Sequence, residues 1–112
     1  MSFFPLIPAK AGTQAFSRMA FYVYILASQR NGTLYIGQTD DVWARIEQHR
    51  NRDFPGFTAK YGVTRLVWYQ SFETREAAFK RERQMKKWNR AWKIRLIEKD
   101  NSGWNDLAAA GL

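Results

Sequence analysis

Three short runs of aromatic and β-branched residues predict strands. The first covers Phe21 to Ala27, and Thr33 to Gly37 is the expected returning strand. Asn31-Gly32 between them is a strong turn signal, so the two strands should form a hairpin. Residues 65–72 alternate well enough for a third strand. In it, Leu66, Trp68 and Gln70 should lie on one face and Val67, Tyr69 and Ser71 on the other.

The hairpin fixes which tyrosines lie together. If its connection has two or four residues centred on Asn31-Gly32, Tyr35 pairs with Ser28. Because side chains alternate along a strand, Tyr24 and Tyr35 then share one face of the sheet. A slip of one residue would separate them.

Helical spacing follows the second and third strands. Asp40 or Asp41 is a suitable N-cap for a helix to about Arg50, and Thr74 for one to about Trp88. A further helical stretch covers residues 90–99. The order strand, strand, helix, strand, helix, helix predicts an α+β fold with a small three-stranded antiparallel sheet flanked by helices.

A length of 112 residues indicates one domain, which we expect over residues 19–100. Residues 1–18 carry two prolines and no clear period, so we interpret them as a poorly ordered extension, with Met19 as an alternative start. Residues 101–112 should form a frayed tail. No window approaches the ~20 apolar residues of a membrane span, and the N-terminus is a poor signal peptide, so we expect a cytoplasmic protein and no membrane partner.

Composition and charge narrow the chemistry. The chain has no cysteine and one histidine, which excludes disulfides, cysteine-based zinc sites and multi-histidine metal clusters. A bound metal would be a hard ion held by carboxylate, phosphate and water, such as Mg²⁺ or Mn²⁺. The net charge is +8, and residues 75–99 alone carry +7. This excess indicates either a solvated helix face or, as we favour, a surface that binds nucleic acid.

Glu82 is the most informative single residue. On a continuous helix, it lies on the same stripe as Ala78, Met85, Asn89, Trp92 and Leu96. A carboxylate on an apolar stripe needs a partner, because burying a lone charge is costly. That partner is either a cation of this chain, Arg45 or a nearby lysine, or a divalent metal ion for which Glu82 is the single protein ligand.

The other candidate site residues indicate a function only in combination. Tyr24 and Tyr35 on one face can pack or transfer protons, and Gly37 beside them lets a backbone or phosphate approach closely. Arg45 and His49 are four residues apart, so they project from one side of their helix. Arg45 is then either a surface arginine or a clamp for a scissile phosphate. His49 is either a structural histidine or a residue that acts as general base or phosphate ligand.

These residues form an ordered set. Tyr22-Val23-Tyr24, then Tyr35-Ile36-Gly37 with Tyr35 eleven residues after Tyr24, and then Arg45, His49 and Glu82 resemble the GIY-YIG nuclease family. Gly56-Phe57-Thr58 with Tyr61 adds to the resemblance, which covers residues 20–100. It is closest to small bacterial single-domain proteins related to the N-terminal catalytic domain of the UvrC excision-repair subunit. Two positions depart from the pattern: Tyr22 replaces the glycine of the name motif, and Gln38 stands where some nucleases carry lysine.

The resemblance implies metal-dependent hydrolysis of one DNA strand, with roles for named residues. Tyr35 would be the general base or its proton relay, and Tyr24 would orient the water or a phosphate oxygen. Arg45 would bind the scissile phosphate, His49 would help with proton transfer or phosphate contact, and Glu82 would hold the metal. Nucleic-acid contacts are expected from Gly37, Lys60, Lys80, Lys86, Lys87, Asn89 and Arg90, with Arg81 and Lys93 as further backbone contacts.

The leading hypothesis is therefore a monomeric DNA endonuclease with little sequence specificity, targeted by a partner protein and acting in DNA repair, with RNA left open as a substrate. The second is a non-catalytic nucleic-acid-binding module that keeps the fold. The third is a protein-interaction domain anchored by exposed tryptophans, since tryptophan is enriched at interface hot spots.

Overall fold

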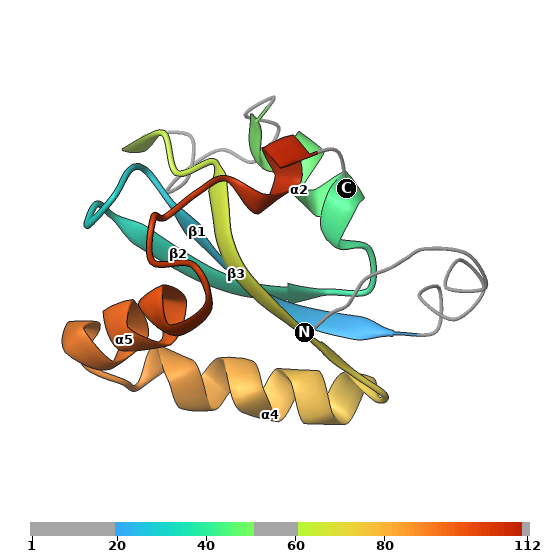
Figure 1. The fold of residues 1–112 in the computed structure, drawn as a ribbon. Helices are drawn as coiled ribbons and strands as arrows, with labels where there is room; N and C mark the ends of the chain where they lie inside the picture. The colour runs from blue at the N-terminus through green and yellow to red at the C-terminus, as the bar shows by residue number, and fades with distance from the viewer. Residues whose placement is uncertain (1–19, 51–60, 111–112) are drawn as a thin grey trace.

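A computed structural model shows a small twisted sheet between two layers of helix (Figure 1). It describes residues 20–50 and 61–110, and the side chains of residues 20–48 and 61–108. The strands are β1 (Phe21–Ala27), β2 (Leu34–Thr39) and β3 (Arg65–Phe72). All pairs are antiparallel, and the order β2-β1-β3 puts β1 in the centre. The helices are α2 (Val42–Arg50), α4 (Arg75–Lys86), α5 (Arg90–Asp100) and the 3-10 helix η1 (Leu107–Ala110).

This architecture confirms the predicted α+β fold and its element order, with η1 added at the end. Polar caps explain where the helices begin. Asp41 Oδ1 accepts a hydrogen bond from Ala44 N at 3.1 Å, and Thr74 Oγ1 accepts one from Ala77 N at 3.0 Å. No helix among the described residues is long and apolar enough to cross a membrane.

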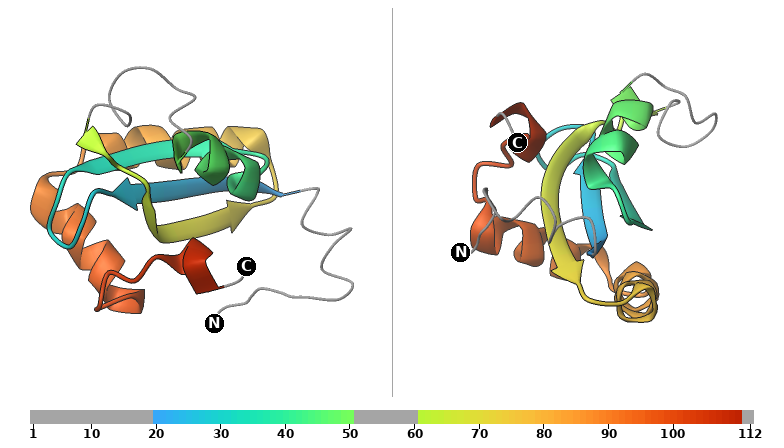
Figure 2. Two further views of the ribbon diagram at one scale, coloured as in Figure 1. Left: turned by 90° about the horizontal axis from the view of Figure 1, so that it is seen from above. Right: turned by 90° about the vertical axis from the view of Figure 1, so that its right-hand side faces the viewer.

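The sheet separates two apolar clusters. α4 and α5 cover one face, while α2 and η1 cover the other (Figures 1 and 2). The α4/α5 side includes Val23 and Ile25 from β1 and Ile97 from α5, all fully buried. The α2 side contains Tyr24 and Leu26 from β1 with α2 residues. Alternate residues of one strand therefore supply both clusters, as the period of two requires.

Two details of the sheet differ from the sequence prediction. The turn is centred on Arg30-Asn31, so Tyr35 pairs with Leu26 and not with Ser28. A shift of two residues keeps the same face, so Tyr24 and Tyr35 still lie together. In β3, a bulge between the partners of Ile25 and Leu26 leaves Val67 without an opposite residue. The expected strict alternation is therefore wrong: Leu66 shares a face with Tyr69, and Trp68 joins Val67 in the other cluster.

The segment after α5 is also different from the predicted frayed tail. Trp104 is fully buried, and its Nε1 donates to Glu98 Oε2 at 2.6 Å. Asn101 Nδ2 donates to the Val67 and Asn105 carbonyls at 3.1 and 2.9 Å. Residues 101–108 thus belong to the packed fold. The expected extension, residues 1–18, lies outside the described residues.

Candidate active site

The two tyrosines of the site meet across β1 and β2. Tyr24 lies opposite Gly37, and Tyr35, which pairs with Leu26, lies two pairs farther along and therefore on the same face. The centroids of the Tyr24 and Tyr35 rings are 6.3 Å apart with the planes tilted by 41°. Tyr24 is almost completely buried, whereas Tyr35 is half-buried. The shared face predicted from the hairpin is therefore confirmed.

Gly37 makes room for this pair. A Cβ added to Gly37 would lie 2.5 Å from Tyr24 Oη and 3.1 Å from Tyr35 Cε2. The space that we expected a phosphate to use is filled by the Tyr24 ring. Gly37 therefore leaves room for the Tyr24 ring over β2, and its contact with nucleic acid stays a prediction.

The surroundings of Tyr24 place four groups in one electrostatic cluster. Burial raises the pKa of the Tyr24 hydroxyl far above its ordinary value of 10.0, and the neighbouring Tyr35 and Glu82 raise this pKa further. Arg45 acts in the opposite direction. Hydrogen bonding with Tyr35 also raises the pKa, which means that Tyr24 is the donor. Tyr24 therefore stays protonated, and two tyrosines, a cation and a carboxylate share one site.

α2 supplies the cation. Arg45 is half-buried in the middle of this helix, one turn before His49. The helix packs on the tyrosine face through Val42 and Ile46, which are buried in the same cluster as Tyr24. This packing directs Arg45 to the tyrosines. The His49 backbone lies in α2, but its side chain lies outside the described residues.

α4 supplies the carboxylate from the other side of the sheet. Glu82 is 9% exposed and lies on the buried side of α4 with Ala78 and Met85. The Lys86 Nζ lies 3.1 Å from Glu82 Oε2, one turn along the helix. The alternative that we left open, a pair with a nearby lysine, is thus present. Because Lys86 is half exposed, the pair contributes less than about 1 kcal/mol, and it can be exchanged for another cation.

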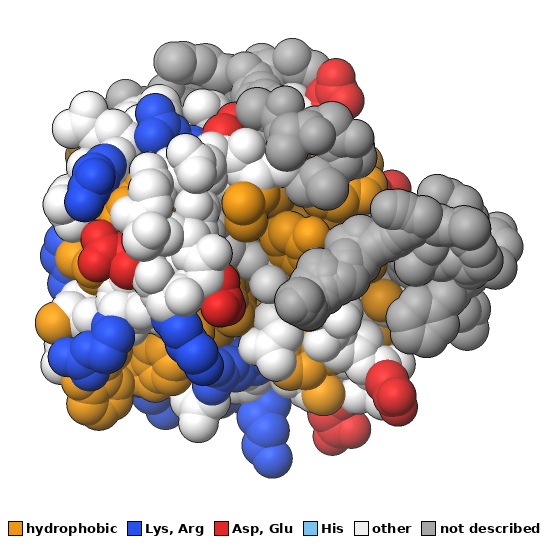
Figure 3. Space-filling view, in the orientation of Figure 1, with side chains coloured by type: hydrophobic (Ala, Val, Ile, Leu, Met, Phe, Trp, Pro, Cys, Tyr) orange, Lys and Arg blue, Asp and Glu red, His pale blue; other side chains and the backbone are white. Residues whose placement is uncertain are grey.

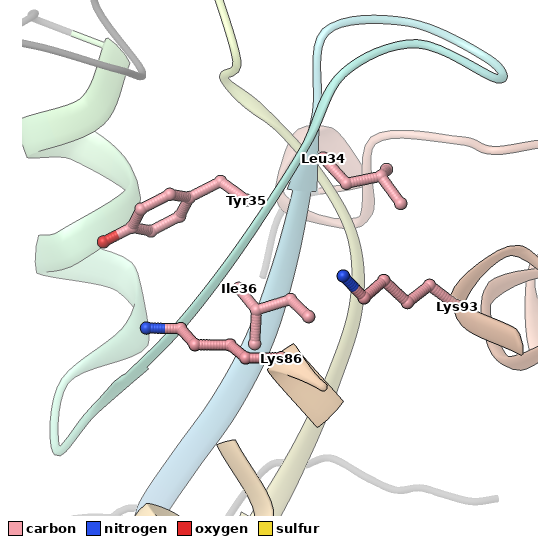
Figure 4. A pocket seen from close by; sticks show the side chains of 5 residues that line it. All are labelled: Leu34, Tyr35, Ile36, Lys86 and Lys93. Carbon is pink, nitrogen blue, oxygen red and sulfur yellow. The ribbon is translucent and has the colours of Figure 1, made fainter. Parts of the chain in front are cut away.

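An open hollow of about 230 Å³ lies over β2, the edge strand next to these groups. It is lined by Leu34, Tyr35 and Ile36 from β2, Lys86 from α4 and Lys93 from α5 (Figure 4). The Tyr35 hydroxyl and the Lys86 ammonium both point toward α2 (Figure 4). A phosphate at this edge would meet positive charge from two helices.

The remaining predicted contact residues separate into two groups. Lys80 and Lys87 are exposed and available to a ligand, whereas Lys60 lies outside the described residues. Asn89 is the N-cap of α5, with its Oδ1 accepting from Trp92 N at 2.9 Å. Arg90 Nη2 donates to the Asn31 and Gly32 carbonyls at 2.6 and 2.7 Å. Asn89 and Arg90 therefore have structural tasks, although both were expected to contact nucleic acid.

The two helical stretches predicted from the sequence are present, so the stripe from Ala78 to Leu96 that one continuous helix would form is interrupted. α4 ends at Lys86 and α5 begins at Arg90, so the stripe breaks between them. Glu82 and Met85 keep their buried positions, but Trp92 is 50% exposed.

Sequence reasoning missed an aromatic group next to the site. The Tyr69 ring packs edge-on against Tyr22 and Trp43, with centroids 6.2 and 5.9 Å away. Burial raises the pKa of Tyr69 to about 12, and the pKa of Tyr22 is also raised, chiefly by burial. The signal was present in the sequence, because Tyr22 lies two residues before Tyr24. The bulge that brings Tyr69 to this face was not predicted.

Glu82 is suited to a metal ion whose other ligands are phosphate oxygens and water. Among the described residues, no group of three or more His, Cys, Asp or Glu side chains could hold a metal ion. Mg²⁺ is commonly bound by one or two carboxylates together with phosphate oxygens and water. A single shielded carboxylate beside a phosphate-sized, cationic hollow matches that donor set.

A three-stranded sheet that presents paired tyrosines, an arginine and a helix-borne carboxylate at one edge defines a nuclease-type domain. The model of the GIY-YIG catalytic domain family matches residues 20–95, and the chain belongs to this family. UPF0213 proteins of Staphylococcus aureus, from strains Mu50 and N315 among others, are 36% identical over 77 residues, which are 69% of this chain and 93% of theirs. The solution NMR structure of a UPF0213 protein from Bacillus halodurans is similar, with a TM-score of 0.50 and 30% identity, covering 83% of this chain and 98% of that one. These findings confirm a small bacterial protein of the GIY-YIG nuclease type.

Proposed function

We propose that this protein is an endonuclease that hydrolyses a phosphodiester bond of DNA with the help of Mg²⁺ or Mn²⁺. The observation that carries the proposal is the electrostatic cluster around Tyr24, in which Tyr35, Arg45 and Glu82 act on one hydroxyl. Hydrolysis of a phosphodiester needs a proton acceptor for water, a cation for the phosphate and stabilisation of the leaving oxygen. The cluster offers a group for each task.

The two tyrosines have different tasks. Tyr24 stays neutral because burial raises its pKa, with Tyr35 and Glu82 adding to the effect, so it does not act as a base. Its hydroxyl proton is engaged with Tyr35, but its oxygen can still accept a hydrogen bond from the attacking water and so orient it. Tyr35 lines the open hollow, where it can contact that water and accept or relay its proton.

Arg45 and Glu82 would bind different charged groups, the phosphate and the metal. The Arg45 guanidinium is suited to bind two oxygens of the scissile phosphate and to stabilise the charge that develops there. Glu82 would hold the divalent metal, which when bound polarises the phosphate and stabilises the leaving oxygen. In that state the Lys86 ammonium is released from Glu82 and becomes available to a neighbouring phosphate. His49 is proposed to assist proton transfer from α2.

Exposed lysines would hold the DNA backbone. Lys80 and Lys87 on the outside of α4 can contact phosphates without reading bases. We therefore propose low sequence specificity, targeting by a partner protein, and DNA repair as the setting, which rests on the family resemblance alone. RNA remains open as a substrate.

The test is nicking of supercoiled plasmid by the wild type, Glu82→Ala and Glu82→Gln, with Mg²⁺, Mn²⁺ or EDTA. Both variants should nick no faster than the wild type does in EDTA, because Glu82 is the proposed protein ligand of the metal. Glu76→Gln is the matched control, since Glu76 lies on the same helix and is exposed; it should keep wild-type activity. Wild-type-like nicking by Glu82→Gln would remove the metal assignment.

One observation favours a second candidate function, a nucleic-acid-binding module without catalysis. The Lys86–Glu82 pair at 3.1 Å satisfies the carboxylate without any metal. In that case the wild type would bind DNA but fail to nick plasmid or branched DNA with either metal. Glu82→Ala would then bind as tightly as the wild type.

A further inference from the structure

A second aromatic surface lies on α5, away from the tyrosine cluster. Trp88 and Trp92 pack edge to face, with ring centroids 6.1 Å apart. Trp92 is 50% exposed, so half of a large apolar side chain faces solvent. Both rings border an open hollow of about 560 Å³ whose other lining residues are Arg95, Leu96, Glu98 and Lys99. Orange apolar and blue cationic side chains lie close together over the α5 region in Figure 3.

The charges around this hollow are mainly positive. The Arg81 guanidinium lies over the Trp88 ring, 5.1 Å from its centroid, and Arg95 and Lys99 border the hollow directly. The carboxylate at the border belongs to Glu98, and its Oε2 accepts the hydrogen bond of Trp104 Nε1. That hydrogen bond engages the carboxylate with the fold. The surface therefore combines an aromatic floor with a cationic border.

Folding does not require this exposure. α5 is held to the core through the fully buried Ile97, and its first turn is closed by Asn89 through the Trp92 backbone, not its ring. The Trp92 ring packs on Trp88, but Trp92 is not among the residues that form or pack against the buried cluster, so the fold does not use its exposed half. An exposed apolar patch with a charged border, such as Trp88, Trp92 and Leu96 beside Arg95 and Lys99, indicates an interaction site.

We propose that this surface binds unpaired bases of single-stranded nucleic acid. A base would stack on the Trp92 ring while Arg95 and Lys99 contact the flanking phosphates. Stacking on aromatic side chains inside a positively charged groove is how single strands are held without sequence preference. A duplex offers no free base faces in its interior, so it gains only the charge contacts.

The position of the surface suggests how such a strand relates to the active site. Lys93 lines the hollow over β2, and the adjacent Trp92 is exposed at the second hollow. A strand whose phosphate lies at Lys86 and Lys93 can thus continue along α5 to the tryptophans. This inference rests on the proposed nucleic-acid substrate, but it concerns binding and not hydrolysis.

The experiment measures fluorescence anisotropy of labelled oligonucleotides in EDTA, so that no cleavage occurs. Three probes are used: an oligothymidylate, an abasic oligonucleotide of the same length and a duplex. Trp92→Ala should weaken oligothymidylate binding by about fivefold or more, with less than a twofold change for the abasic strand and the duplex. Phe79→Ala is the matched control, because Phe79 is 45% exposed on α4 and does not line the hollow; it should change nothing.

Arg95→Gln sharpens the test. It should weaken the oligothymidylate and the abasic strand by equal factors, because it removes a phosphate contact and leaves the stacking surface. Equal losses for the two strands in Trp92→Ala would overturn base stacking. No loss with any probe would also overturn the proposal and would point to a protein partner. If the wild type bound none of the three probes, the result would contradict the proposed nucleic-acid function as well as this surface.

Discussion

The two faces of the sheet share the same strands but differ in chemistry. Toward α4 and α5, β1 presents Val23, Ile25 and Ala27, all fully buried in a cluster without titratable groups. Toward α2, the same strand presents Tyr22 and Tyr24, whose hydroxyls have raised pKa values. One face thus supplies most of the apolar burial, and the other supplies polar atoms held in place by that burial.

This difference shows how a small domain can keep a reactive site rigid. A chain of this length has little surplus stability, so polar groups must be buried sparingly. Because side chains alternate along β1, its tyrosine hydroxyls all lie on the face toward α2. Substitutions on the two faces should therefore have separable effects, one on reaction rate and the other on the free energy of unfolding.

Tyr35→Phe should have the largest effect. It removes one hydroxyl and so should slow single-turnover cleavage by about 10²- to 10⁴-fold, the usual contribution of a general base. DNA affinity should stay near the wild-type value, and the free energy of unfolding should fall by only about 1–3 kcal/mol, because the buried Tyr24 hydroxyl loses its hydrogen-bond partner. Tyr69→Phe, on the same face but packed on Tyr22 and Trp43, is the control and should keep the wild-type rate. A Tyr35→Phe rate equal to that of the wild type would exclude Tyr35 from the mechanism.

Ile25→Ala should have the opposite signature. It empties a fully buried position on the face toward α4 and α5, so the free energy of unfolding should fall by about 2–5 kcal/mol. The single-turnover rate of the folded fraction should remain within a few-fold of the wild type. Urea denaturation and cleavage measured on the same sample separate the two quantities. A large loss of rate in fully folded protein would show that the faces are not independent.

Gly37→Ala tests the close contact between β2 and the Tyr24 ring. The new methyl group would come within 2.5 Å of Tyr24 Oη, so Tyr24 or the strand must move. We expect a loss of about 1–3 kcal/mol in the free energy of unfolding, together with slower cleavage. The cost should largely disappear in a Tyr24→Ala background, where the clash is absent. Additive costs in the double variant would mean that Gly37 acts on the backbone and not on Tyr24.

Alkaline pH should destabilise the tyrosine face. The pKa values of Tyr22, Tyr24 and Tyr69 are raised in the folded protein, whereas unfolded tyrosines ionise near pH 10.0. Above about pH 10 the unfolded chain loses tyrosine protons that the folded chain keeps. The contribution of these tyrosines to the free energy of unfolding is therefore fully present below about pH 10 and is lost as the pH rises further. Each tyrosine contributes a slope of at most about 1.4 kcal/mol per pH unit. Tyr69→Phe should reduce the slope in urea denaturation between pH 9 and 11; an unchanged slope would contradict this origin.

The same alternation explains what the sequence could predict. Strand residues, the hairpin and the caps Asp41 and Thr74 follow from local preferences, and they place Tyr24 beside Tyr35. Glu82 was recognisable because a carboxylate on an apolar stripe is exceptional. Its partner was not, because a carboxylate can be satisfied equally by a neighbouring lysine or by a metal.

What escaped prediction depends on contacts distant in sequence. The bulge at Val67 accompanies the Asn101 side chain, which donates to the Val67 carbonyl from the other end of the domain. Arg90 resembles any other cation of the basic segment until its contact with the Asn31 carbonyl is seen. Trp104 could not be recognised as core, because a lone tryptophan after a helix carries no periodic signal.

The contact of the C-terminal segment with β3 has a consequence for self-association. β3 is an edge strand, and such edges are templates for pairing with other chains. Asp106 Oδ1 accepts a hydrogen bond from Leu66 N at 3.2 Å and so engages a donor that an incoming strand would need. At the opposite edge, Lys86 and Lys93 lie beside β2. The cations proposed to hold a phosphate thus also oppose edge-to-edge aggregation, and neutralising them should lower the concentration at which the protein remains in solution.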